Sequence, residues 1–271
     1  MSERPRMIGY NRTVKLPWLD ETVDLYLAGQ SEAEIGEVLR ERLQDQLSVG
    51  SNAERGSREK TITILLKTWV RVPARVGGLR DEGIGLLRRV RRSERLPLHW
   101  GMTMAAYPFW RVVADVTGRL FRLQGTASAQ QVQRRVRELH GEREAVSRSA
   151  RYVLRAFADW GVIADTEAKG TYVPAPATRI DDPSIGTWLL EAALFASEAD
   201  STDFKGLVHS PALFPFHLAR VSSESLRRSG RLDVVRHGME EEMVLLRHPI
   251  LEGTGLSRTS RALKGAPRGP R

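Results

Sequence analysis

The 271-residue chain contains no cysteine, which excludes disulfide bonds, thiolate zinc sites and cysteine nucleophiles. It also lacks any run of about 18 apolar residues, so no transmembrane helix is expected. The first residues do not contain the apolar stretch of a secretory signal. We therefore expect a cytoplasmic protein that has no membrane partner.

Sequence motifs for catalysis are missing as well. The six histidines are scattered, without the HExxH or paired spacing of a metal site. No GxGxxG or GxxxxGK[ST] phosphate loop and no GxSxG nucleophile elbow occurs. The acidic run 240–242 is expected at an exposed hairpin edge rather than at a metal. The sequence therefore predicts a protein that is not an enzyme, and it implies no cofactor.

Lysine is scarce, although the chain is basic. The formal net charge is +9, and only six of the 42 basic residues are lysine. A basic balance is typical of proteins that bind a polyanion, with nucleic acid first among the candidates. A bias toward arginine is expected just as well from a GC-rich genome, so the charge alone does not decide between these explanations.

The N-terminal half has the pattern of a helical bundle. Residues 1–17 predict an extended arm that ends at a Leu-Pro pair. From 18 to 124, apolar residues recur at helical spacing with short connections, and no convincing strand pattern is present. The arginine-rich run 88–95 is interpreted as a solvated helix face or, alternatively, as a set of phosphate contacts that adds sequence-independent attraction to DNA.

The segment 125–176 contains the most informative pattern. Ser128 is a suitable N-cap for a first helix, a short glycine-containing break follows, and a second helix is predicted over 144–160. Strand-like residues at 162–163 and 171–173 then flank a tight turn. This order of parts is typical of a winged helix-turn-helix, a module that docks its second helix in the DNA major groove.

The spacing of side chains separates an inner from an outer face in this segment. In the first helix, Val132, Val136 and Leu139 are predicted to face the core. The outer face of the second helix is polar. The guanidinium groups of its arginines can bind guanine or phosphate, and a serine near the start of the helix can donate a hydrogen bond to phosphate. The predicted DNA-contacting residues are Ser147, Arg148, Arg151, Tyr152, Arg155, Lys169 and Thr171.

The C-terminal part, 177–248, repeats some of this layout. It predicts a helix after Asp182-Pro183, and later a short helix, a glycine and two strands that end at Leu246. We interpret these parts as a degenerate second winged helix or, alternatively, as a small helix-plus-hairpin that serves only packing. The glycine- and arginine-rich residues 249–271 predict a disordered basic tail that adds non-specific attraction to DNA.

Some of these features resemble component A of the BREX bacteriophage-exclusion systems. The similarity lies in the Tyr-Pro-Phe stretch 107–109 that opens a helix, a Ser-X-X-Arg-like helix start, the ending 159–163 before a wing, and the helix-plus-hairpin 226–246. The resemblance implies a non-enzymatic DNA-binding subunit that works beside other defence proteins. The longer N-terminal arm and the basic tail depart from that family.

The sequence thus predicts a mainly α protein that consists of an N-terminal helical bundle, a winged helix-turn-helix and a C-terminal helix-plus-hairpin. Its predicted partner is double-stranded DNA. Two alternatives remain open: a protein–protein adaptor of the same fold within a multi-subunit complex, and a transcriptional regulator.

Overall fold

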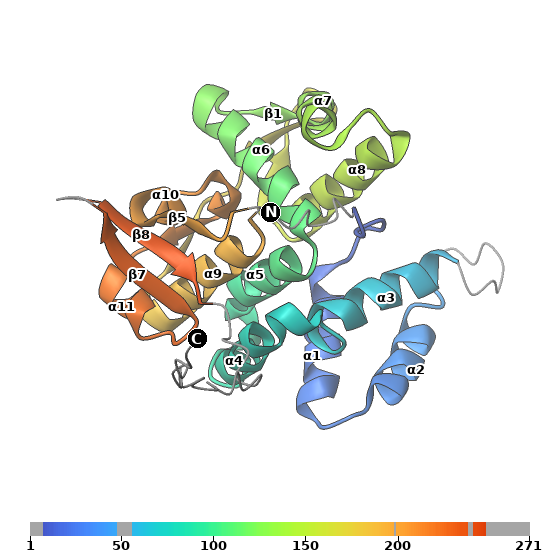
Figure 1. Ribbon diagram of the computed structural model, residues 1–271. Helices are drawn as coiled ribbons and strands as arrows, with labels where there is room; N and C mark the ends of the chain where they lie inside the picture. Colours follow the sequence, from blue (N-terminus) through green and yellow to red (C-terminus); the bar gives the residue numbers. More distant parts are fainter. Residues whose placement is uncertain (1–7, 48–55, 198, 238–240, 248–271) are drawn as a thin grey trace, which may run out of the picture.

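The computed structural model describes residues 8–47, 56–197, 199–237 and 241–247, and these form a mainly helical protein with small sheets (Figure 1). The mainly α fold class is therefore confirmed. The predicted tail 249–271 lies outside the described residues. Among the described helices, none combines the length and the apolar character that a membrane span requires.

The N-terminal half is helical throughout, and its described residues contain no strand. Ser31 and Glu34 form a capping box that starts the second helix, and Pro108 starts the sixth, where its missing N–H is no loss. The elements are α1 (Leu16–Leu27), α2 (Glu32–Arg42), α3 (Ser57–Trp69), η1 (Ala74–Val76), α4 (Gly77–Leu87), η2 (Arg92–Glu94), α5 (Leu96–Ala106) and α6 (Pro108–Gln124).

The rest of the chain mixes helices with short strands. The elements are β1 (Ala127–Ser128), α7 (Ala129–His140), α8 (Glu144–Asp159), β2 (Ile163–Asp165), β3 (Thr171–Pro174), β4 (Thr178–Ile180), α9 (Pro183–Phe195), β5 (Ser201–Asp203), α10 (Phe204–Val208), η3 (Pro211–Leu213), β6 (Phe216–Leu218), α11 (Ser223–Arg227), β7 (Leu232–His237) and β8 (Glu241–Leu246).

Two three-stranded antiparallel sheets share one topology. In the first, the strand order is β1-β3-β2, and in the second it is β5-β8-β7. In both, a short strand leads directly into a helix and pairs with the last strand of a hairpin. We name residues 108–174 the first helix–hairpin unit and residues 183–246 the second. A parallel pair joins β4, which lies between the two units in the chain, to β6, which lies within the second unit.

Three details differ from the sequence-based expectations. The polar composition between Ser197 and Ser210 is typical of a loop, but this stretch contains β5 and α10, which at three and five residues are too short to show a periodicity. Leu139 is not part of the core, because 54% of it is exposed near the end of α7. Helix α1 begins inside the predicted arm.

The described part of the arm is packed rather than free. Tyr10 and Val14 are buried, and Tyr10 makes an edge-on contact with Trp110, whose ring centroid lies 5.1 Å away. The indole of Trp160 donates a hydrogen bond of 2.8 Å to the carbonyl oxygen of Val14. The arm thus fixes the end of α8 to the helical half.

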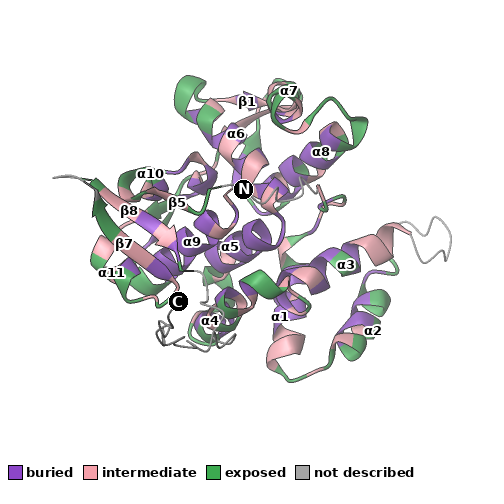
Figure 2. Cartoon of the chain, in the orientation of Figure 1, coloured by how far each residue is buried: buried purple, intermediate pink, exposed green. Residues whose placement is uncertain are grey.

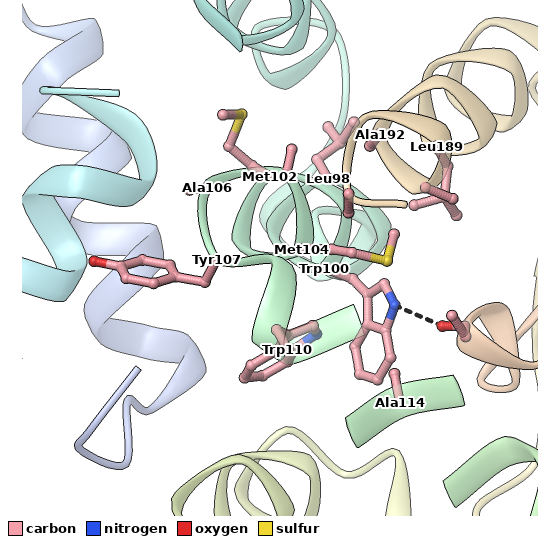
Figure 3. Close-up of a cluster of buried hydrophobic side chains, with 14 of the residues drawn as sticks. Leu98, Trp100, Met102, Met104, Ala106, Tyr107, Trp110, Ala114, Leu189 and Ala192 are labelled. Atoms are coloured by element: carbon pink, nitrogen blue, oxygen red, sulfur yellow. Dashed lines mark hydrogen bonds between the residues drawn. The ribbon is translucent and has the colours of Figure 1, made fainter. Parts of the chain in front are cut away.

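Helix α5 lies at the centre of the fold and is buried on every side (Figures 2 and 3). Every residue from 97 to 106 is buried, as expected for a helix that other elements surround. Gly101 allows the ring of Trp188 on α9 to approach the α5 backbone closely. One cluster of buried residues joins the segments 18–124, 125–176 and 177–248.

A buried ion-pair network attaches the second helix–hairpin unit to the helical half. Glu191 on α9 has no exposed surface and accepts hydrogen bonds from Arg231, which also pairs with Glu82 on α4. Burial raises the pKa of Glu191, and the bonds from Arg231 only partly oppose this. Arg231 therefore compensates a carboxylate that water does not reach.

Removing Arg231 should destabilise the protein strongly. We expect Arg231→Met to lower the free energy of unfolding by about 3–5 kcal/mol, because Glu191 would be left buried and unpaired. The matched control is Arg247→Met, which breaks the exposed pair with Asp233 and should cost less than about 1 kcal/mol. Urea unfolding measures both, and equal losses would contradict the prediction.

A second buried network surrounds His99 on α5. The indole of Trp69 can only donate, so its 3.0 Å bond makes Nδ1 of His99 the acceptor and puts the ring proton on Nε2. Nε2 then donates to Asp20 over 3.0 Å. Burial lowers the pKa of His99, and the bond to Asp20 opposes this only in part. The folded protein therefore holds a neutral imidazole.

This geometry predicts a pH-dependent stability. Because the pKa of His99 is lower in the folded state than the value of about 6.5 in the unfolded chain, the unfolded state binds more protons below that pH. Stability should consequently fall as the pH decreases below about 6.5. His99→Gln, which can still bond to both partners, should flatten this slope in urea unfolding, whereas His209→Gln at an exposed site should not. Identical slopes in both variants would contradict the assignment.

Candidate nucleic-acid interface

The first helix–hairpin unit positions α8 with one face inward and one outward. Ser128 and Gln131 form a capping box that starts α7, and Gly141, with φ of +91°, ends it. Helix α8 then crosses α7 and buries a stripe at helical spacing. The buried residues of this stripe are Val146, Ser149, Ala150, Val153, Leu154, Ala156 and Phe157.

The outer face of α8 contains the three predicted arginines. Arg148, Arg151 and Arg155 are all exposed, and their spacing of three and four residues puts them on one side over about 10 Å of helix. Ser147 and Tyr152 on the same helix are half-buried. The structure thus brings the five α8 residues predicted from the sequence onto the accessible side of one helix.

The arginines of this face differ in their partners. Arg148 pairs with Glu144 one turn earlier at 2.7 Å. In the part of the chain that the structure describes, no carboxylate forms an ion pair with Arg151 or Arg155. Exposed pairs within a helix are worth only about 0.3–0.5 kcal/mol, so Arg148 is easily released to another anion.

The hairpin β2–β3 places the remaining two predicted residues. Lys169 is exposed in the turn before Gly170, whose φ of +74° suits glycine. Thr171 pairs with Ser128 in the β1–β3 ladder, so it lies at the start of α7 rather than on the α8 face. Burial raises the pKa of Tyr172, and the charge of Arg155 acts against this shift. Arg155 therefore lies close to the hairpin.

Arg12 is a further cation at this face that the sequence did not reveal. Its guanidinium lies 5.6 Å from the ring centroid of Tyr152, and its Nε donates to Ser57 of α3 over 3.0 Å. The predicted arm therefore contributes a positive charge beside α8. Only the basic composition of the arm hinted at this, because the contact joins residues that are far apart in sequence.

The arginine run 88–95 is separate from this face and is largely paired. Arg92 and Arg95 contact Asp20 and Asp24 on α1. Arg91 pairs with Glu94, a residue of the same run. In Figure 1, α4, which precedes the run, and α1, which carries Asp20 and Asp24, lie at the lower end, whereas α7 and α8 lie at the upper end. Two exposed residues of the run, Arg88 and Arg89, form no ion pair with any described carboxylate.

Metal ligands do not gather anywhere in the described part of the chain. No group of three or more histidine and acidic side chains that could hold an ion is found within these residues.

Comparisons of the chain with protein family models, curated proteins and solved structures find no match.

Proposed function

We propose that the first helix–hairpin unit is a winged helix-turn-helix and that the protein binds duplex DNA through α8. The order α6-β1-α7-α8-β2-β3 and the sheet order β1-β3-β2 support this interpretation of the fold. The observation that carries the DNA proposal is the pair Arg151 and Arg155, exposed on the helix after the turn and without a described carboxylate partner.

The dimensions of the parts suit such a complex. An α-helix with its side chains is about 10–12 Å wide, and the major groove of B-DNA is about 12 Å wide. With α8 in the groove, Arg151 and Arg155 reach base edges or phosphates, and Ser147 and Arg148 near the helix start reach a phosphate. Lys169 at the hairpin turn contacts the neighbouring backbone, and Arg12 adds charge beside Tyr152.

The second helix–hairpin unit is inferred to be a degenerate copy of the first. It shares the strand order, but α11 has 5 residues whereas α8 has 16. A helix of this length is too short to lie along the DNA major groove in the way proposed for α8. The DNA-binding role is therefore assigned to the first unit alone. The resemblance to BREX component A extends the proposal to a non-catalytic subunit of a phage-defence system.

Fluorescence anisotropy with a labelled duplex at several salt concentrations tests the proposal. Arg151→Gln combined with Arg155→Gln should weaken binding about tenfold or more. The logarithm of the affinity falls linearly with the logarithm of the salt concentration. The double change should reduce the magnitude of that slope by about 0.9 for each phosphate that the variant no longer neutralises. The matched control is Arg88→Gln with Arg89→Gln, which removes the same charge from exposed positions away from α8.

Two results would contradict the proposal. One is a wild-type protein that does not bind the duplex even at low salt. The other is an equal reduction of affinity in the control variant, which would show attraction by net charge only. A stable protein partner found together with absent DNA affinity would favour the adaptor instead.

The ion pair between Glu144 and Arg148 allows a test in which the affinity for duplex DNA should increase. Glu144→Gln removes a negative charge beside the proposed phosphate contact and releases Arg148, so duplex affinity should rise about two- to threefold. Glu94→Gln, which releases Arg91 at the other end of the molecule, is the control and should leave the affinity unchanged. Weaker binding by the Glu144 variant would argue against contact at the start of α8.

A further inference from the structure

A pocket of about 330 Å³ lies between α6 and the segment 208–218. Its inner wall includes the aromatic residues Phe121, Phe214 and Phe216 beside the buried Leu213. Pro174, the last residue of β3, closes another side, so the pocket is located where the first and second helix–hairpin units meet. Its volume falls at the lower end of the range for small-molecule sites, which is about 300–1,000 Å³.

The inner wall is fixed by packing within the protein. Phe121 and Phe214 have ring centroids 5.3 Å apart, and Phe216 contacts the buried Trp100 edge-on at 5.7 Å. A Cβ at Gly118 would collide with the carbonyl oxygen of Pro211, which shows that α6 and η3 touch directly. The pocket is therefore preformed, and a ligand would lose little affinity to reorganisation of the wall.

The mouth of the pocket contains one permanent charge, the guanidinium of Arg122. Arg122, His209 and His217 line it and are exposed, and no aspartate or glutamate is among the lining residues. No carboxylate within the described ranges forms an ion pair with Arg122. A guanidinium that no described carboxylate engages, beside an aromatic inner wall, suits a ligand carboxylate, to which its fork can bond in two places.

We propose that this pocket binds a small aromatic carboxylate. The ring of the ligand packs against Phe121, Phe214 and Phe216, and its carboxylate faces Arg122 with the two histidines beside it. A neutral ring compound would lack the ionic contact, and a small inorganic anion would leave the aromatic wall unfilled. The proposal does not depend on DNA binding, because the contacts involve none of the α8 side chains.

Titration calorimetry of the full-length protein with benzoate tests this proposal. We expect saturable binding with a Kd of about 1 mM or tighter, which is reasonable for so small a ligand. The neutral analogue benzamide should bind at least about tenfold more weakly. Inorganic phosphate should not displace benzoate.

A matched pair of variants locates the site. Arg122→Gln should weaken benzoate binding about tenfold. Arg119→Gln, on the same helix but paired with Asp115 and not part of the lining, should leave binding unchanged. Circular dichroism melting checks that both variants fold. Absent saturation, equal affinity for benzamide, full competition by phosphate, or an unchanged Kd in the Arg122 variant would overturn the proposal.

Discussion

The packing of Trp100 on α5 is the contact on which the arrangement of the other parts depends. Its ring stacks on Phe157 of α8 at 4.9 Å and meets Trp110 of α6 edge-on at 5.4 Å. Its indole nitrogen donates to the carbonyl oxygen of Ala212 over 3.2 Å. One buried side chain thus holds the central helix, the first helix–hairpin unit and the second helix–hairpin unit together. Truncating such a residue typically costs about 3–5 kcal/mol.

This contact determines what α8 can present to a partner. Because Phe157 is held by Trp100 from within, the rotation of α8 about its axis is fixed, and the arginines opposite Phe157 are directed outward. The proposed ligand pocket shares the same cluster, since Phe214 lies 5.7 Å from Phe157 and 5.5 Å from Trp100. The α8 face and the pocket are therefore two outer sides of a single aromatic core.

Local sequence signals were sufficient to predict the long elements of the first helix–hairpin unit. The capping box at Ser128, the glycine that ends α7 and the apolar stripe of α8 all act within a few residues, so periodicity and capping rules detect them. Strands β1 and β5 escaped detection because they have two and three residues and are defined by pairing with distant strands. Arg12 was missed for the same reason, since its contact with Tyr152 exists only after folding.

Ion pairing within the protein determines which of the many arginines can contact an anionic partner. The amino-acid composition does not show which arginines are paired. In the second helix–hairpin unit, Arg227 and Arg228 pair with Glu224, and Arg231 is committed to the buried Glu191. In the first unit, Arg151 and Arg155 have no described carboxylate partner. The two units share a strand order, but both arginines at the end of the short helix of the second are paired with Glu224, whereas Arg151 and Arg155 are exposed on the 16-residue α8. That difference is the physical basis for proposing a nucleic-acid face on α8 alone.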